Sequence, residues 1–297
     1  MYKVILDTDI GDDIDDAIAL SLAVNRPEIE LQGVVTTYRN AFLRSKIAMA
    51  LLDGWQRNDI PVYMGCDDPI KQAYYYFPFE KRDENGKPVI GHYEDYMSGF
   101  CVRETSGLEF MANAVRANPH EITLVAIGPL TDVARFCERY PAEYALLKEI
   151  VIMGGRFDEQ RAEWNIKCDP EAAYTVLSSD QKIRLVPLDV TLQCVFSQEQ
   201  ARRLHEGSGG NERLCKMIDV WLTNSKHNSM PILHDPLALA SVFSDFCGFT
   251  AKKVRVALDG AQRGVTLFDA ENGKEILIAL TVRAHEFTEF VCNSLCG

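Results

Sequence analysis

The 297-residue sequence has no C-x-x-C pair among its nine cysteines, no internal repeat and no apolar run long enough to cross a membrane. The odd number of cysteines and their spacing argue against a disulfide framework, so we expect reduced thiols that serve as packing residues. An excess of positive charge is also missing. The net charge of −12 argues against nucleic acid and membrane surfaces as partners. No apolar segment precedes the first predicted strand, and we therefore expect a cytoplasmic protein.

What the sequence does contain is a regular alternation of short apolar runs and helical patterns. With 47% apolar residues, the chain can bury one large core, and we expect a single domain over residues 1–297. The alternation predicts an α/β fold, in which helices cover both faces of a mostly parallel central sheet. Strands are expected at 4–6, 31–37, 61–64, 122–127, 150–153 and 183–187. Helices are expected to begin at residue 15 and to cover 41–53 and 108–117.

Two regions depart from this alternation. Three short runs near the C-terminus, Val254–Ala257, Val265–Phe268 and Ile276–Leu280, predict antiparallel strands at one edge of the sheet. Residues 67–105 are rich in aromatic side chains and show little periodicity, which is typical of a lid-like insertion. Within this insertion, we expect His92 to be a solvent-exposed loop residue.

The first twenty residues carry the densest chemistry. A short apolar run predicts a buried strand, and six aspartates follow within ten residues, at positions 7, 9, 12, 13, 15 and 16. Ligands of open α/β sheets bind beyond the carboxyl ends of the strands. Crowded carboxylates raise one another's pKa, so that keeping them ionised requires a cation, and hard oxygen ligands favour calcium or magnesium over zinc.

A simpler explanation covers only some of these aspartates. Acidic residues are common at helix N-termini, which accounts for Asp12, or for Asp15 and Asp16. It does not account for Asp7 and Asp9 at the end of an apolar strand. The cluster therefore favours a metal or catalytic site.

Two further motifs contain polar residues of interest. His234-Asp235-Pro236 begins a predicted helix, and His234 is a candidate acid near neutral pH. Asp169-Pro170, in contrast, is explained by helix capping alone. Glu163-Trp164-Asn165 combines a carboxylate, an aromatic ring and an amide, which suits a polyhydroxylated ring, although a solvated loop explains this motif nearly as well.

These motifs, taken in order, resemble those of the calcium-dependent inosine-uridine-preferring nucleoside hydrolases. The resemblance begins with Asp-Thr-Asp-x-Gly…Asp-Asp-Ala and spans most of the chain. The further matching segments are 34–37, Asn40, 127–131, 153–155, 163–165, 169–173, 189–191 and 234–238. The resemblance implies a hydrolase that cleaves the N-glycosidic bond of ribonucleosides and forms a homodimer or homotetramer.

The resemblance also implies a role for each matching residue. Asp9 would be a calcium ligand and the general base that takes a proton from a metal-bound water. The further calcium ligands would be Asp16, Asp235 and the backbone carbonyl of Ile127. The ribose would be held by Asp15, Asn40, Met153, Glu163 and Asn165. His234 would stand near the leaving base, and Trp221 would stack on it.

The sequence departs from the family pattern at two places. Asp13 and Ile14 lengthen the loop before Asp15 and Asp16, so Asp13 is an alternative to either aspartate. The loop at 156–162 lacks the Gly-Asn that family members use at the ribose 5′ end. This leaves open whether the side chain of Arg156, Gln160 or Arg161 substitutes, or whether the substrate carries a different 5′ group.

Two other functions are compatible with parts of this pattern. A phosphatase of the haloacid dehalogenase type also opens with a strand and Asp-x-Asp, but the acidic cluster would repel phosphate and no Gly-rich phosphate loop is evident. A calcium- and ribose-binding protein without catalytic competence is the other alternative, because the loop at 156–162 is short.

Overall fold

The computed structural model describes residues 1–75, 81–207, 212–224 and 230–296. Its described part contains a nine-stranded sheet with the order β3-β2-β1-β4-β5-β6-β9-β7-β8. The strands are β1 Tyr2–Thr8, β2 Ile29–Thr36, β3 Val62–Met64, β4 Ile122–Ala126, β5 Glu149–Met153, β6 Ile183–Val186, β7 Cys247–Val256, β8 Thr266–Phe268 and β9 Lys274–Val282. The six strands predicted before residue 190 are all present, and the α/β fold is confirmed.

The C-terminal strands agree with the prediction in part. β7 pairs antiparallel with both β8 and β9, as the broken apolar runs indicated. However, β9 also pairs in parallel with β6, through Arg184 with Leu277 and Leu185 with Ile278. The last strand of the chain therefore lies inside the sheet and extends its parallel part, while β7 and β8 form the edge.

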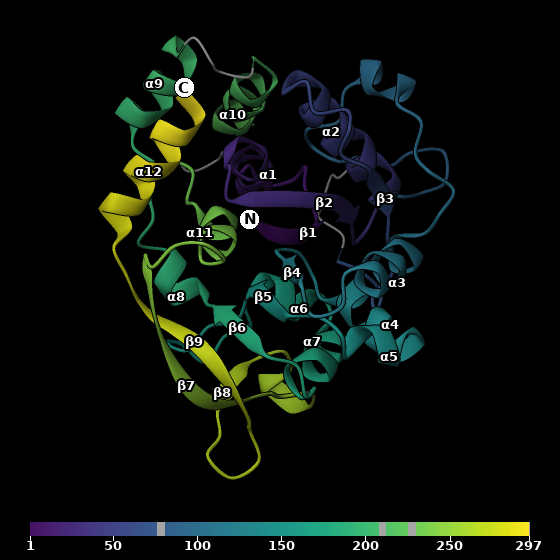
Figure 1. Ribbon diagram of the computed structural model, residues 1–297, viewed down its shortest axis with the longest axis vertical. Coiled ribbons are helices and arrows are strands. Elements are labelled where there is room, and N and C mark those ends of the chain that lie inside the picture. Colours follow the sequence, from purple (N-terminus) through teal and green to yellow (C-terminus); the bar gives the residue numbers. More distant parts are fainter. Residues whose placement is uncertain (76–80, 208–211, 225–229, 297) are drawn as a thin grey trace.

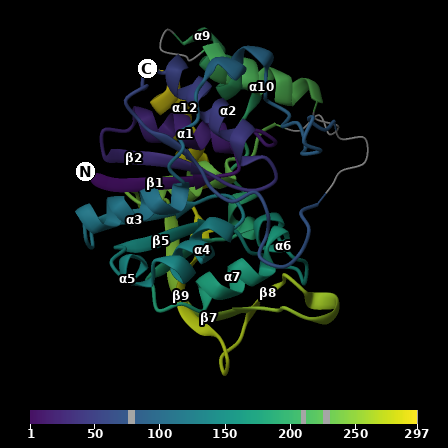
Figure 2. The ribbon, with the colours of Figure 1, turned by 90° about the vertical axis from the view of Figure 1, so that its right-hand side faces the viewer.

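Helices cover both faces of this sheet (Figures 1 and 2). Val4 and Leu6 of β1 belong to the core on one face, and Ile5 between them belongs to the core on the other. This alternation is the two-residue period of a strand that is buried on both sides. The first face is packed by α1 Asp15–Asn25, α2 Ala41–Gly54, α9 Gln198–Glu206, α10 Glu212–Asn224, α11 His234–Ala240 and α12 Ala284–Cys296. The second face is packed by α3 Gly107–Ala117, α4 Thr131–Arg139, α5 Pro141–Tyr144 and α7 Pro170–Leu177.

The strand order creates a crevice between β1 and β4. From β1 the chain proceeds to β2 and β3 on one side, whereas β4, β5 and β6 follow on the other. The connections that leave β1 and β4 therefore diverge, and this switch point is where α/β sheets bind ligands. Two short helices lie near these strand ends, α6 Trp164–Cys168 and α8 Leu188–Thr191.

The described residues of the segment 67–105, which are 67–75 and 81–105, are irregular apart from an isolated bridge between Arg82 and Pro88 and a short 3-10 helix at Asp95–Gly99. His92 of this segment is buried, with 5% of its surface exposed, and its backbone N–H donates to the carbonyl of Gly11 at 2.9 Å. The expectation that His92 is a solvent-exposed loop residue is wrong, because the segment folds back against the loop after β1. Among the described residues, no helix combines the length and apolar character that crossing a bilayer requires.

Candidate functional site

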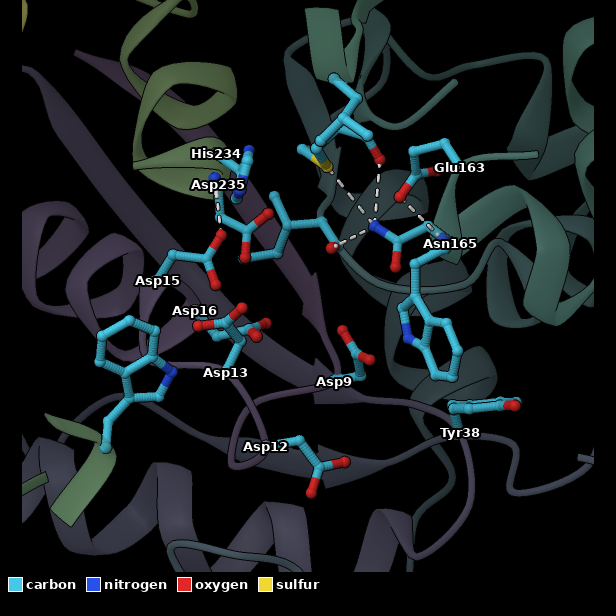
Figure 3. Close-up of a pocket in the computed structure, with 15 residues that line it drawn as sticks. Asp9, Asp12, Asp13, Asp15, Asp16, Tyr38, Glu163, Asn165, His234 and Asp235 are labelled. Atoms are coloured by element: carbon cyan, nitrogen blue, oxygen red, sulfur yellow. Dashed lines mark hydrogen bonds between the residues drawn. The ribbon is translucent and has the colours of Figure 1, made fainter. Parts of the chain in front are cut away.

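A cavity of about 380 Å³ lies at the switch point between β1 and β4. Its wall is built from the ends of β1, β2, β4, β5 and β6 and from the start of α11 (Figure 3). This volume is within the usual range for small-molecule sites. The lining residues are Asp9, Asp12, Asp13, Asp15, Asp16, Tyr38, Ile127, Met153, Glu163, Trp164, Asn165, Leu188, Trp221, His234 and Asp235.

Three buried carboxylates meet at one end of this cavity. One oxygen each from Asp15, Asp16 and Asp235 lies within 4.8 Å of the others, and we call these three residues the acid group. Asp15 and Asp16 occupy the first turn of α1, and Asp235 occupies the first turn of α11, so two helix N-termini converge here. Neither helix has a side-chain cap, and their positive ends favour the negative charge of the acid group.

The acid group has the chemistry of a cation site. Burial, followed by repulsion between neighbouring carboxylates, raises the pKa of Asp15, Asp16 and Asp235 well above the ordinary value. The described lining of the cavity contains no lysine or arginine that could neutralise them. A hard divalent ion would pair with all three carboxylates and keep them ionised, so these residues fit the predicted metal.

Asp9 lies outside the acid group but in the same cavity. Figure 3 shows its carboxylate between the acid group and the pair Glu163 and Asn165. Burial raises the pKa of Asp9 to about 6, although the nearby Arg44 guanidinium opposes that rise. The family resemblance implied that Asp9 is a metal ligand and that Asp15 contacts the ribose, whereas the structure places Asp15 in the acid group. Coordination of a metal by Asp9 stays a prediction.

Glu163 and Asn165 form the opposite wall. Glu163 caps α6: its Oε1 accepts from the Asn165 N–H at 2.9 Å, and its Oε2 accepts from the Gly155 N–H at 3.1 Å. Burial raises the pKa of Glu163 to about 7. The Asn165 amide donates to the carbonyls of Ile127 at 2.8 Å and Met153 at 3.3 Å. Four residues predicted to contact the ligand or metal are therefore joined in one hydrogen-bonded wall.

His234 lies next to the acid group at the start of α11. Its Nδ1 is 2.6 Å from Oγ1 of Thr191, which in turn donates to the Leu188 carbonyl at 3.2 Å. Which of these two atoms donates depends on the tautomer of the imidazole. Burial lowers the pKa of His234 to about 4, so the ring is neutral at pH 7. Protonating a leaving base would first require His234 to gain its second ring proton.

Trp221 and Asp13 form another part of the wall. Trp221, from α10, and Asp13 both line the cavity, and the Trp221 side chain opposes the rise that burial causes in the pKa of Asp13. The Asp13 carboxylate accepts from the Ile14 N–H at 2.7 Å. Asp13 therefore faces the cavity beside Trp221, whereas Asp15 and Asp16 together belong to the acid group.

Asn40 differs from the other predicted site residues. It caps α2, where its side-chain oxygen accepts from the Leu43 N–H at 3.3 Å. Its amide nitrogen donates to Asp83 at 3.1 Å and to the Pro88 carbonyl at 3.0 Å, and Asn40 is absent from the cavity lining. The second lone pair of the Asn40 side-chain oxygen is therefore the group left for a ribose hydroxyl, and this contact stays a prediction.

The structure also identifies lining residues that the sequence analysis gave no role. Tyr38 follows β2 and Leu188 follows β6, and both strand ends lie at the cavity. Their position after a strand was the available signal, but many residues share it. None of the side chains at 156–162 lines the cavity, and Arg156 instead pairs with Asp158 at 2.5 Å.

The sequence matches known proteins along nearly its whole length. Residues 4–289 match the model of the family described as inosine-uridine preferring nucleoside hydrolase. Uridine nucleosidase 1 of Arabidopsis thaliana is 33% identical over 282 residues, which cover 90% of this chain and 82% of that protein.

Solved structures give the same result. A plant nucleoside hydrolase superposes with a TM-score of 0.85 at 26% identity, covering 100% of this chain and 99% of the other. The purine-preferring ribonucleoside hydrolase of Gardnerella vaginalis gives 0.83 at 25% identity, with coverage of 100% and 98%. The phosphatase alternative is not favoured by these matches. The chain belongs to the inosine-uridine preferring nucleoside hydrolase family of N-ribosyl hydrolases, as its ordered motifs predicted.

Proposed function

We propose that this protein hydrolyses the N-glycosidic bond of a ribonucleoside with a calcium ion held at the acid group and Asp9 as general base. The observation that carries this proposal is the convergence of three buried, mutually repelling carboxylates at the switch-point cavity. Calcium prefers several oxygen ligands in flexible geometry, and Asp9 and Ile127 supply further oxygen atoms to the lining of the same cavity.

The cavity offers mainly hydrogen-bond acceptors. The Asn165 amide nitrogen is already bonded to backbone carbonyls, which leaves its Oδ1 as the free group, and Glu163 and the aspartates are acceptors when ionised. Ribose hydroxyls are donors and match such a wall. A 5′-phosphate would meet negative charge on several sides, so we propose nucleosides rather than nucleotides as substrates.

Bond cleavage then follows from the positions of the side chains. Asp9 accepts a proton from the attacking water, whose oxygen forms a bond to C1′ while the bond from C1′ to the base nitrogen breaks. The ribosyl group passes through an oxocarbenium-like transition state, and the anionic wall stabilises its positive charge. Calcium, when bound, supplies positive charge that keeps the carboxylates ionised and orients oxygen atoms of the substrate and water.

The departing base is proposed to leave on the side of Trp221 and His234. The Trp221 ring would stack on the base, and stacking would hold the glycosidic bond over Asp9. His234 would deliver a proton to the base once its own ring has gained its second proton, so that the base leaves as a neutral molecule.

A nucleoside panel tests the proposal. Purine, pyrimidine and nicotinamide ribosides are each incubated with the protein, and released reducing sugar is measured before chelation, after chelation and after calcium is restored. We expect turnover of at least one nucleoside, loss on chelation and recovery with calcium. Asp180→Asn controls for the loss of a carboxylate outside the cavity, because the Asp180 side chain is fully exposed and pairs with Lys274. Binding of nucleosides without any sugar release would favour the non-catalytic alternative instead.

Two further expectations accompany this function. We propose that the protein is a homodimer or homotetramer, which light scattering of the purified protein tests. We also propose that the segment 67–105, of which residues 76–80 lie outside the described part, acts as a lid. Its residue Tyr75 lies beside the cavity: the Tyr75 N–H donates to the Tyr38 hydroxyl at 3.0 Å, and the ring centroids of Tyr75 and Trp164 are 5.8 Å apart. Protection of this segment from hydrogen exchange by a bound nucleoside would support a lid.

A further inference from the structure

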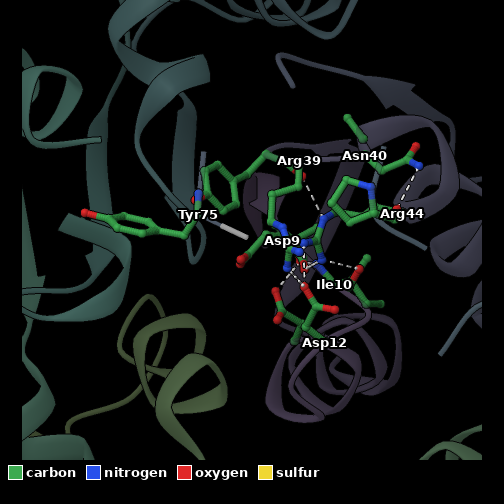
Figure 4. A network of polar contacts seen from close by, with 12 residues as sticks. Asp9, Ile10, Asp12, Arg39, Asn40, Arg44 and Tyr75 are labelled. Carbon is green, nitrogen blue, oxygen red and sulfur yellow. Dashed lines mark hydrogen bonds and ion pairs between the residues drawn. The ribbon is translucent and has the colours of Figure 1, made fainter. Parts of the chain in front are cut away.

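Arg44 is a fully buried cation directly behind the cavity. It belongs to α2, and none of its surface is exposed. Figure 4 shows its guanidinium surrounded by acceptors from two loops. Nε donates to the Tyr38 carbonyl at 2.9 Å, and Nη2 donates to the Asp12 carboxylate at 2.8 Å. Nη1 donates to the Ile10 carbonyl at 3.0 Å and also to the carbonyl of Asp9.

These acceptors connect the ends of two neighbouring strands. Asp9, Ile10 and Asp12 follow β1, and Tyr38 follows β2. The loop after β2 is strained, since Tyr38 and Arg39 have φ values of 69° and 65°, in the left-handed region that non-glycine residues rarely adopt. One buried side chain therefore holds a strained loop against the loop that carries Asp9.

Asp12 behaves differently from the other aspartates of its loop. Burial raises the pKa of Asp12, but the guanidinium groups of Arg44 and Arg39 outweigh it and bring the pKa below the ordinary value. The Arg39 guanidinium is 3.4 Å from the same carboxylate oxygen. Asp12 is thus the counter-ion of Arg44.

Arg44 cannot act on a substrate directly, because it does not line the cavity. Arg44 can affect the reaction through Asp9, because its guanidinium donates to the backbone carbonyl of Asp9. We propose that Arg44 is a positioning residue, which fixes the loop from Asp9 to Asp12 so that the Asp9 carboxylate is held toward the acid group. This inference rests on the proposed function of Asp9 as general base.

The planar fork of arginine is essential to this role. Its donors point in separate directions and reach the Tyr38 carbonyl, the loop carbonyls and Asp12 at once. Lysine carries its three donors on one nitrogen and lacks the fixed fork. We therefore expect Arg44→Lys to keep the buried charge and lose the positioning.

The test compares Arg44→Lys, Arg44→Ala and a matched control, Arg26→Ala. Arg26, like Arg44, pairs with a carboxylate, that of Glu28 at 2.7 and 3.1 Å, but it lies near the start of β1, at the far end of that strand from Asp9. Steady-state kinetics are measured with saturating calcium, well below the melting temperature of each variant. For both Arg44 variants we expect kcat to fall about 100-fold with KM within about threefold, because a reacting group misplaced by about 1 Å costs that much.

Two further measurements separate positioning from stability. Guanidinium ion added at millimolar concentration should partly restore kcat of Arg44→Ala and leave the wild type and Arg26→Ala unchanged, whereas sodium should restore nothing. Asp12→Asn removes the counter-ion alone and should lower kcat about tenfold, which keeps the test decisive if Arg44→Ala fails to fold.

The outcomes are distinct. Suppose that the wild type is active and that kcat of Arg44→Lys and of Asp12→Asn stays within about threefold of the wild-type value, even if these variants melt at a lower temperature. This result would overturn the role of Arg44 and leave the proposed function intact. Wild-type protein that hydrolyses no nucleoside would overturn the proposed function and the role of Arg44 with it.

Discussion

The lack of a side chain at Gly128 lets the segment after β4 approach Asp9 closely. A Cβ atom at Gly128 would lie 2.9 Å from the backbone nitrogen of Asp9, 2.9 Å from its Oδ1 and 3.0 Å from Cγ2 of Thr37. Ordinary contacts begin near 3.4 Å, so Gly128→Ala requires Asp9 to move by about 0.5 Å. Gly128 is not among the residues with positive φ, so the backbone itself tolerates alanine and the cost is the contact.

This displacement sets the expected loss of rate. A misplacement of about 1 Å costs about 100-fold, so half of it corresponds to about tenfold in kcat, or about 1.4 kcal/mol in the activation free energy. The assay measures kcat and KM for the nucleoside that the panel identifies, with saturating calcium. We expect kcat to change and KM to remain close to the wild-type value, because the group that moves is the proposed base and not part of the proposed ribose wall.

Gly99→Ala is the matched control. Gly99 also lacks a positive φ, and a Cβ atom there meets nothing within 4 Å. Its kcat should equal that of the wild type. A folded Gly128→Ala variant with kcat within about twofold of the wild type would refute the reasoning, because Asp9 would then either not need its position or not act as the base.

Three other predictions concern the same cavity. Asp9→Asn should fold normally and lose about 100-fold or more in kcat, whereas Asp180→Asn should not, and near-wild-type turnover would remove Asp9 as the base. Trp221→Ala should raise KM about tenfold with little change in the calcium requirement, measured by titrating nucleoside and calcium separately; an unchanged KM would remove the stacking contact. Without calcium, the protein should melt at a lower temperature at about pH 7.5 than at about pH 5.5. Burial raises the pKa values of the acid group and Asp9, so the folded protein holds protons on these carboxyl groups that the unfolded chain has already released, and raising the pH removes this stabilisation. His92 and His234, whose pKa values are lowered by burial, oppose this trend, but the carboxylates outnumber them. Added calcium should remove the difference between the two melting temperatures. A calcium-free protein that is more stable at the higher pH would contradict the expected ionisation.

The sequence predicted those parts of the fold that depend on local patterns. Strand positions followed from apolar runs, and the cavity followed from the rule that polar residues after parallel strands meet at one edge. The pairing of β9 with β6 was not predictable in this way, because a short apolar run does not indicate its neighbour in the sheet.

The candidate site shows the same division. Asp15, Asp16 and Asp235 were recognised as site residues, but only the tertiary structure brings Asp15 into the acid group. Asn40 was assigned by its motif; its side chain also caps α2, and its contact with the ribose stays a prediction. Arg44 had a signal that was missed. It shares a helix face with Ala48 and Leu51, and a charged residue on such a face requires buried partners.

The acid group draws its members from opposite ends of the polypeptide, since Asp15 and Asp235 are 220 residues apart. During synthesis, the first two carboxylates emerge long before the third, and a nascent chain has no complete set of ligands until most of it has left the ribosome. Ion capture would therefore come late and would favour only chains whose two ends have met. Binding of the cation would thus stabilise the completely folded chain and complete the active site in the same event.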